Sequence, residues 1–220
     1  SGDIIALCDN GSIDFDDTVL PIIIPSDGLT YQPNTGDTII LDGTDLGLGG
    51  CGGGVATGIK TTNHTNITIQ GFIIQNIGDT YCQTANSDAS GIYAVNSGII
   101  NAINMTIDNS ADQNFQMVGS PGVTMNITNS TSTNATDDGA SCHIGSLTVT
   151  GSYFSGNSEG LGFLSPCTIN VSDSTFSNNG TSISVQGNNF IGDNLTIDVY
   201  EGQNGVNFGT VSSASILKNS

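Results

Sequence analysis

The stretch CTINVSDSTFSNN, residues 167–179, carries the pattern that decides the fold. Ile169 and Val171 alternate with small polar residues, which is typical of a strand with one buried face. The segment SLTVT, at 146–150, repeats the pattern one period earlier, with Leu147 and Val149 at the matching positions. The stretch is therefore interpreted as one copy of a repeat.

The same apolar–polar–apolar–polar form occurs six times along the chain. Its apolar pairs are Ile67 and Ile69, Met105 and Ile107, Met125 and Ile127, Leu147 and Val149, Ile169 and Val171, and Leu195 and Ile197. A strand this short cannot bury its apolar face alone, but copies stacked about 4.8 Å apart bury it along their whole length. A period of about 22 residues is long enough for three short strands and their turns.

We therefore predict an all-β fold, a right-handed single-stranded parallel β-helix with about 22 residues per coil. Residues 1–37 are less regular, and we expect them to form an N-terminal cap or the first irregular coils. Residues 38–220 would form the β-helix, and the whole chain would be a single domain. The alternative is a β-sandwich of many short strands, which does not explain a near-constant period.

The repeat also predicts which side chains stack inside the β-helix. Positions one period apart should form internal columns, because equivalent residues of successive coils lie above one another. The expected columns are Met125–Leu147–Ile169, Ile127–Val149–Val171 and Phe154–Phe176.

The chain resembles the right-handed parallel β-helix proteins in TIILDG (38–43), GIKTTNHTNITIQGFIIQN (58–76) and GIYAVNSG (91–98), followed by the repeats. That superfamily includes pectate lyases, polygalacturonases, bacteriophage tailspikes and surface adhesins. The F-x-x-N spacing in FSGN (154–157) and FSNN (176–179) also resembles the polymorphic outer-membrane adhesins. The resemblance implies the fold and a structural or adhesive role, although one fold hosts many functions.

The composition restricts the partners. The chain has two lysines, no arginine and 20 acidic residues, for a formal net charge of −18. Two lysines against 20 acidic residues are too few to neutralise the phosphates of a nucleic acid, so we expect no nucleic-acid partner. No run of 18 or more apolar residues occurs, so we expect no membrane insertion. The chain begins at Ser1 without Met, which suits a secreted product and predicts an extracellular or cell-surface location; the alternative is that the sequence is a fragment of a longer chain.

TDDGASCHIGS, residues 136–146, holds the candidates for a catalytic site, Asp137, Asp138 and His143. The polygalacturonase resemblance implies such groups on successive coils together with an R-x-K motif. Here they share one coil, NFQM (114–117) one turn earlier has no carboxylate, and arginine is absent. We expect the two aspartates to lie in a solvated loop. The sequence predicts a non-catalytic protein, and the alternative is a polysaccharide-active, lyase- or hydrolase-like, or carbohydrate-binding β-helix.

CDNGSIDFDD, residues 8–17, is a candidate for a Ca²⁺ site because it is rich in oxygen ligands. The candidate ligands are Asp9, Asn10, Asp14, Asp16 and Asp17. The alternative is an acidic turn without metal, since the spacing does not match an EF-hand loop. We expect no other cofactor.

The five cysteines leave at least one unpaired within the chain. Cys142 and Cys167 are separated by about one repeat, so stacked coils would bring them within disulfide reach. The alternative is that they are small buried hydrophobic residues.

Ten N-x-S/T sequons predict glycosylation if the chain passes through a glycosylating secretory route. They begin at Asn10, Asn63, Asn66, Asn104, Asn126, Asn129, Asn134, Asn170, Asn179 and Asn194. The alternative is that outward positions of a weakly charged solenoid are filled by Asn, Thr and Ser, which creates sequons by accident.

The ends of a solenoid expose backbone edges and apolar core. VNFGTVSSASIL, residues 206–217, still has strand character almost to the end of the chain. We therefore predict end-to-end self-association, which would make the chain a filament subunit or a surface stalk, with a host-surface or glycan ligand as a further candidate partner.

Overall fold

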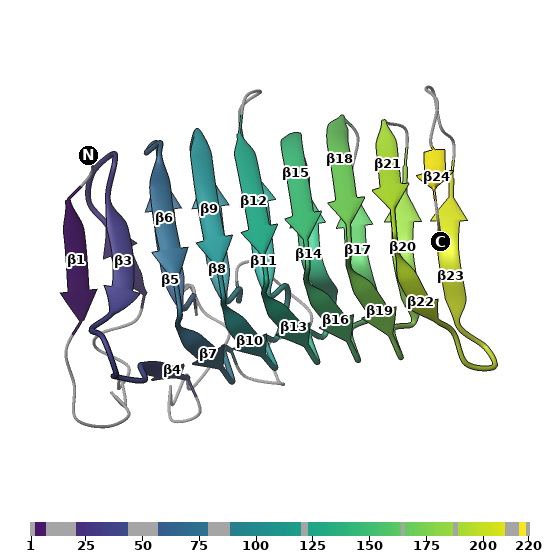
Figure 1. Ribbon diagram of the computed structural model, residues 1–220, viewed down its shortest axis with the longest axis horizontal. Helices are drawn as coiled ribbons and strands as arrows, with labels where there is room; N and C mark the ends of the chain where they lie inside the picture. The colour runs from purple at the N-terminus through teal and green to yellow at the C-terminus, as the bar shows by residue number, and fades with distance from the viewer. Residues whose placement is uncertain are drawn as a thin grey trace.

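The computed structural model is an elongated parallel β-solenoid (Figure 1). The structure describes residues 3–7, 21–43, 57–78, 89–119, 123–163, 166–186, 189–209 and 216–218. Within these residues there is no helix, and neighbouring strands in each sheet pair in parallel. The prediction of an all-β solenoid of stacked coils is confirmed.

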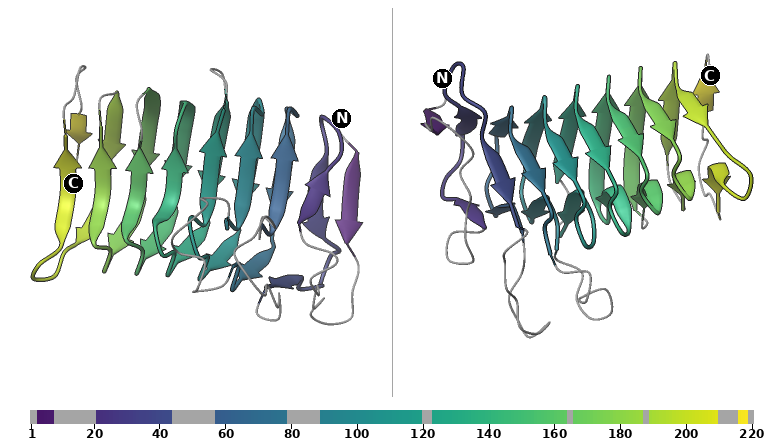
Figure 2. Two further views of the ribbon diagram at one scale, coloured as in Figure 1. Left: turned by 180° about the vertical axis from the view of Figure 1, so that it is seen from behind. Right: turned by 90° about the horizontal axis from the view of Figure 1, so that it is seen from below.

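Three sheets run the length of the rod, and a coil contributes one strand to each in turn (Figure 2). Sheet A consists of β1 (Ile4–Leu7), β3 (Thr30–Pro33), β6 (Ile67–Gln70), β9 (Ile99–Ile103), β12 (Thr124–Thr128), β15 (Gly145–Thr150), β18 (Cys167–Ser172), β21 (Phe190–Asp193) and β24 (Ile216–Lys218). Sheet B consists of β2 (Ile22–Ile24), β5 (Ile59–Thr62), β8 (Ile92–Val95), β11 (Phe115–Val118), β14 (Asp138–Cys142), β17 (Glu159–Phe163), β20 (Thr181–Val185) and β23 (Asn204–Phe208). Sheet C consists of β4 (Ile40–Asp42), β7 (Ile73–Gln75), β10 (Thr106–Asp108), β13 (Thr131–Thr133), β16 (Tyr153–Ser155), β19 (Thr175–Ser177) and β22 (Thr196–Asp198).

The core consists of continuous columns of like side chains between the three sheets. Leu147 of β15 pairs with Met125 on one side and Ile169 on the other, as predicted. Phe154 and Phe176 are paired in sheet C, and their rings stack with centroids 5.2 Å apart and planes inclined by 14°. All of these side chains are buried. The columns confirm the predicted register in this part of the chain.

Two of the six copies of the apolar–polar repeat lie in sheet C, although the other four copies, which share the same pattern, lie in sheet A. Ile107 lies in β10 of sheet C, where it pairs with Ile74 and Ser132 rather than with Ile127. Ile197 likewise lies in β22 of sheet C and pairs with Phe176. A half-buried strand shows the same alternation in all three sheets, so the pattern does not indicate which sheet a strand joins.

The coils are longer toward the N-terminus. In sheet A, the side chain of Asn101 contacts Thr68 of the preceding coil across a sequence separation of 33 residues. Asn126 of the following coil contacts Asn101 across 25 residues. Farther along the rod, Ser152 and Ser174 of successive coils are hydrogen-bonded across 22 residues. The predicted period of about 22 residues is confirmed, and the coils nearer the N-terminus are longer than this value.

Left-handed backbone at the corners explains why Asn, Gly or Asp follows each strand of sheet A. Five consecutive corners between sheets A and C have positive φ angles. They are Asn104 (52°), Asn129 (48°), Gly151 (61°), Asp173 (52°) and Asn194 (52°). Gly adopts this conformation at no steric cost, and Asn and Asp tolerate it better than other residues.

The serines that follow these corners form a polar ladder inside the rod. Ser152 Oγ accepts a hydrogen bond from the backbone N–H of Ser130 at 3.1 Å, and Ser174 Oγ accepts one from the N–H of Ser152 at the same distance. Each hydroxyl joins two coils, so the buried backbone groups at the corner are satisfied.

The F-x-x-N segments have a structural role at the next corner. Asn157 Oδ1 accepts a hydrogen bond from the N–H of Ala135 at 2.9 Å, and Asn179 Oδ1 accepts one from the N–H of Asn157 at 3.0 Å. Both asparagine side chains are buried. The motif thus encodes a stacked phenylalanine followed by an internal amide ladder.

The described residues of the region 1–37 join the same sheets as the rest of the rod. Strands β1 and β3 pair with each other at the edge of sheet A, and β2 pairs with β5 in sheet B. At this end Ile24 and Leu41 are buried, whereas Ile4 and Ile23 are exposed.

Candidate functional site: an acidic pocket on sheet B

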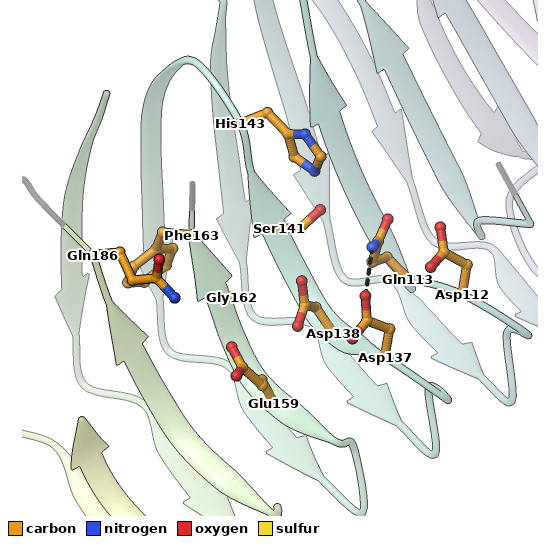
Figure 3. A pocket seen from close by; sticks show the side chains of 10 residues that line it. All are labelled: Asp112, Gln113, Asp137, Asp138, Ser141, His143, Glu159, Gly162, Phe163 and Gln186. Carbon is orange, nitrogen blue, oxygen red and sulfur yellow. Dashed lines mark hydrogen bonds between the residues drawn. The ribbon is translucent and has the colours of Figure 1, made fainter. Parts of the chain in front are cut away.

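A pocket of about 340 Å³ lies on sheet B, where residues of β14 and β17 line it together with residues just before β11 and just after β20 (Figure 3). Four carboxylic acids, one imidazole and several uncharged polar groups line it. The lining residues are Asp112, Gln113, Asp137, Asp138, Ser141, His143, Glu159, Gly162, Phe163 and Gln186. The predicted catalytic candidates, Asp137, Asp138 and His143, thus share one site with groups from neighbouring coils.

The carboxylates come from three successive coils. The backbone N–H of Asp137 donates to the carbonyl of Asp112 at 3.0 Å, and the N–H of Glu159 donates to the carbonyl of Asp137 at 3.1 Å. The expectation of no carboxylate one turn before Asp137 is therefore wrong. That coil is longer than the repeat predicts, so the residue stacked below Asp137 is Asp112.

Asp138 does not lie in a solvated loop, as the sequence suggested, but begins strand β14. Its side chain is 8% exposed, whereas Asp137 beside it is exposed. Asp138 pairs with Glu159 and Ala140 with Leu161, in the same register as the rest of the two strands. The carboxyl group of Asp138 points toward the pocket (Figure 3).

A glycine on the next strand makes room for this carboxyl group. A Cβ atom at Gly162 would overlap both carboxylate oxygens of Asp138. The side chain of Asp138 therefore packs directly over the backbone of β17. Any larger residue at position 162 would displace it.

Burial and neighbouring negative charges change the protonation of the pocket. Burial, reinforced by Asp137, Glu159 and Asp112, raises the pKa of Asp138 to about 9. Burial also raises the pKa of Glu159, partly opposed by a hydrogen bond from Ser184. The pKa of His143 is lowered by burial, against the opposing charge of Asp137. At neutral pH Asp138 is therefore a protonated acid and His143 is uncharged.

Two buried polar atoms of the pocket have no hydrogen-bond partner. Gln113 Nε2 donates to Asp137 Oδ2 at 3.0 Å, but Gln113 Oε1 accepts nothing. Ser141 Oγ is also unpartnered, although this side chain is only 3% exposed. Unsatisfied buried polar groups are rare in proteins, and both of these line the pocket.

Sequence reasoning found three of the lining residues and missed the others. The sequence contained a signal for Asp112 and Glu159. In three successive coils an acidic residue stands just before the sheet B strand or at its start, namely Asp112, Asp137 and Glu159. It was obscured by the longer coil between the first two. Nothing in the sequence singled out Gln113 or Ser141.

The described residues do not contain a preformed metal centre. No three His, Cys, Asp or Glu side chains among them are arranged to hold one ion. The candidate Ca²⁺ ligands Asp9, Asn10, Asp14, Asp16 and Asp17 lie outside the described residues.

A disulfide bond borders the pocket. Cys142, directly after Ser141, is joined to Cys167, with their Cα atoms 6.3 Å apart. It links the end of β14 in sheet B to the start of β18 in sheet A, so it crosses a corner between successive coils.

The structure separates the ten sequons into different environments. Most of those that are described lie in exposed corners with positive φ: Asn63, Asn66, Asn104, Asn129, Asn134 and Asn194. Asn126 and Asn170 lie on the outer face of sheet A and are half-buried. Asn179 is fully buried in the amide ladder, so its side chain is inaccessible in the folded protein. Asn10 is outside the described residues.

No protein-family model and no curated protein matches the chain. The part of the chain that the structure describes also holds no helix long and apolar enough to cross a membrane.

Proposed function

We propose that this chain is an extracellular or cell-surface adhesive β-solenoid that binds a surface carbohydrate in the pocket of sheet B. The rod supplies a stiff scaffold, because successive coils are hydrogen-bonded to one another along three sheets. The pocket lies on the outer side of one sheet and is lined by residues of successive coils.

The observation that carries this proposal is the pair of unpartnered polar atoms, Ser141 Oγ and Gln113 Oε1. A buried polar group without a partner is costly, and a ligand that supplies the missing hydrogen bond recovers that free energy. Sugars present many hydroxyl groups that donate and accept hydrogen bonds. The pocket volume also falls in the range of small-ligand sites.

The test is a glycan array followed by titration calorimetry with the glycans that bind. Ser141→Ala removes one of the unpartnered atoms, and loss of its hydrogen bond should weaken binding roughly two- to tenfold. Ser146→Ala, on the outer face of sheet A, is the matched control and should leave the affinity unchanged. Equal affinities of the wild type and Ser141→Ala would contradict this placement of the site.

A second candidate function is hydrolysis of a polysaccharide in the same pocket. Protonated Asp138 among three other carboxylic acids favours it, since glycoside hydrolysis uses a protonated acid together with a second carboxylate. Release of reducing sugar from a polysaccharide panel, abolished in Asp138→Asn, would replace the adhesive proposal with this one. Binding without turnover would exclude it.

End-to-end self-association remains part of the proposed structural role. Tyr200 and Phe208 are exposed at the C-terminal coil, as are Ile4 and Ile23 at the N-terminal coil. Exposed apolar groups beside sheet edges favour contact with another chain. Light scattering over a concentration series tests this role, and a strict monomer at high concentration would contradict it. Calcium binding by residues 8–17 is tested separately, by melting with and without a chelator.

A further inference from the structure

We infer that the pocket selects an uncharged sugar, and that the Asp138 carboxyl group donates a hydrogen bond to one of its hydroxyl groups. This inference rests on the proposed carbohydrate-binding function and specifies the ligand class and the polarity of the contact.

The charge of the pocket excludes acidic sugars. Four of the lining residues are carboxylic acids, and no lysine or arginine is among them. The ammonium group of Lys60, on strand β5, lies instead over the ring of Tyr93, 5.3 Å from its centroid. A uronate or sialate would therefore meet like charges in the pocket with no lysine or arginine to offset them.

The hydrogen-bonding groups of the pocket match a hydroxyl-bearing ligand. Gln113 Oε1 can only accept, and Ser141 Oγ can both donate and accept. Protonated Asp138 adds a donor between Ser141 and Glu159 (Figure 3). A sugar hydroxyl donates one hydrogen bond and accepts others, so it can satisfy donors and acceptors of this set together.

The position of Asp138 is fixed by the fold. Its carboxyl group packs over Gly162, and the strand pairing with Glu159 holds the backbone. A donor held in place in this way loses little conformational freedom when the ligand binds. Phe163, which is buried at one end of the pocket, provides an apolar wall.

The experiment compares tetrasaccharides of equal length by titration calorimetry. The probes are neutral oligomers of glucose, mannose and galactose, the galacturonic acid oligomer and the glucosamine oligomer. At pH 6 we expect a neutral probe to bind at least tenfold more tightly than the acidic one. Its affinity should fall as the pH is raised through about 9, where Asp138 loses its proton.

Variants of Asp138 distinguish the loss of its hydrogen-bond donor from damage to the folded structure around the pocket. Asp138→Asn keeps a donor of the same shape, so it should retain binding and lose the pH dependence. Asp138→Ala should weaken binding roughly tenfold, because it removes the donor. Asp198→Asn, an exposed aspartate on β22, is the control and should change neither property. A thermal melt of each variant verifies that it folds.

The outcomes distinguish the two levels of the proposal. Tightest binding of the acidic or the glucosamine probe overturns the neutral-sugar inference and leaves the adhesive function standing. If a neutral sugar binds with the same pH dependence in the wild type and in Asp138→Asn, the inferred hydrogen bond from Asp138 is wrong, and the adhesive function again stands. Absence of binding to every probe and to the glycan array contradicts the proposed function itself.

Discussion

Replacing Asp138 by asparagine should stabilise the protein at alkaline pH and leave it nearly unchanged at acidic pH. Burial and three neighbouring carboxylates raise the pKa of Asp138 to about 9. The unfolded chain has an ordinary aspartate with a pKa near 4, roughly 5 units lower. Between these two values the folded state binds one proton more than the unfolded state, so the free energy of unfolding decreases as the pH rises.

The magnitude follows from the linkage slope, about 1.4 kcal/mol per pH unit for one proton. From pH 5 to pH 8 this group should therefore lower the stability of the wild type by about 4 kcal/mol. Asparagine has no proton to lose and resembles the protonated acid in shape. The variant should match the wild type near pH 3, exceed it by roughly 1.5 kcal/mol at pH 5 and exceed it by roughly 5.5 kcal/mol at pH 8.

Urea denaturation of both proteins at pH 5, 6, 7 and 8 measures the difference. Repulsion within a chain of net charge −18 also changes with pH, but it affects both proteins almost equally and largely cancels in the comparison. The exposed Asp198→Asn variant controls for the loss of one negative charge. Parallel stability curves for the wild type and Asp138→Asn would refute the conclusion that Asp138 is buried and protonated.

Three further changes probe the packing. Phe176→Ala should lower the free energy of unfolding, measured by urea denaturation, by about 3–5 kcal/mol, because it empties one position of the stacked column. Tyr153→Ala, on the outer face of sheet C, is the control and should lower it by about 0.5 kcal/mol or less. Gly151→Ala should lower stability by about 1–2 kcal/mol, because alanine is strained at a φ of 61°, and an unchanged melting temperature would contradict this corner geometry. Replacing both Cys142 and Cys167 by serine should cost about 3.5 kcal/mol for the 25-residue separation, and the same loss should appear when the wild type is measured under reducing conditions.

Sequence reasoning predicted the late coils well because their register is a local property. From Met125 to Ile169 the coils have equal length, so the alternation of apolar residues and the position of Phe154 are repeated without interruption. The assignment failed where coil length changed. Met105 and Ile107 have the same alternation as Met125 and Ile127. Yet Ile107 lies in strand β10 of sheet C, and Met105 directly precedes that strand.

The candidate site was predicted only in part for the same reason. Asp137, Asp138 and His143 were visible as a cluster in the sequence, but their burial and their neighbours were not. Asp112 is brought beneath Asp137 by a longer coil, and Glu159 is brought above it by a shorter one. The protonation of Asp138 depends on these contacts, so no pattern within residues 136–146 could indicate it.

That this protein is a stack of short parallel strands follows from its amino-acid sequence. The period, the apolar alternation and the Asn, Gly and Asp residues at the corners are local features, and each is sufficient to fix a strand or a turn. Which strands are neighbours, and therefore where the acidic pocket lies, depends on the three-dimensional packing of the coils. Stacking joins residues that lie a whole coil apart in the sequence, so one change in coil length alters every contact between the coils on either side of it.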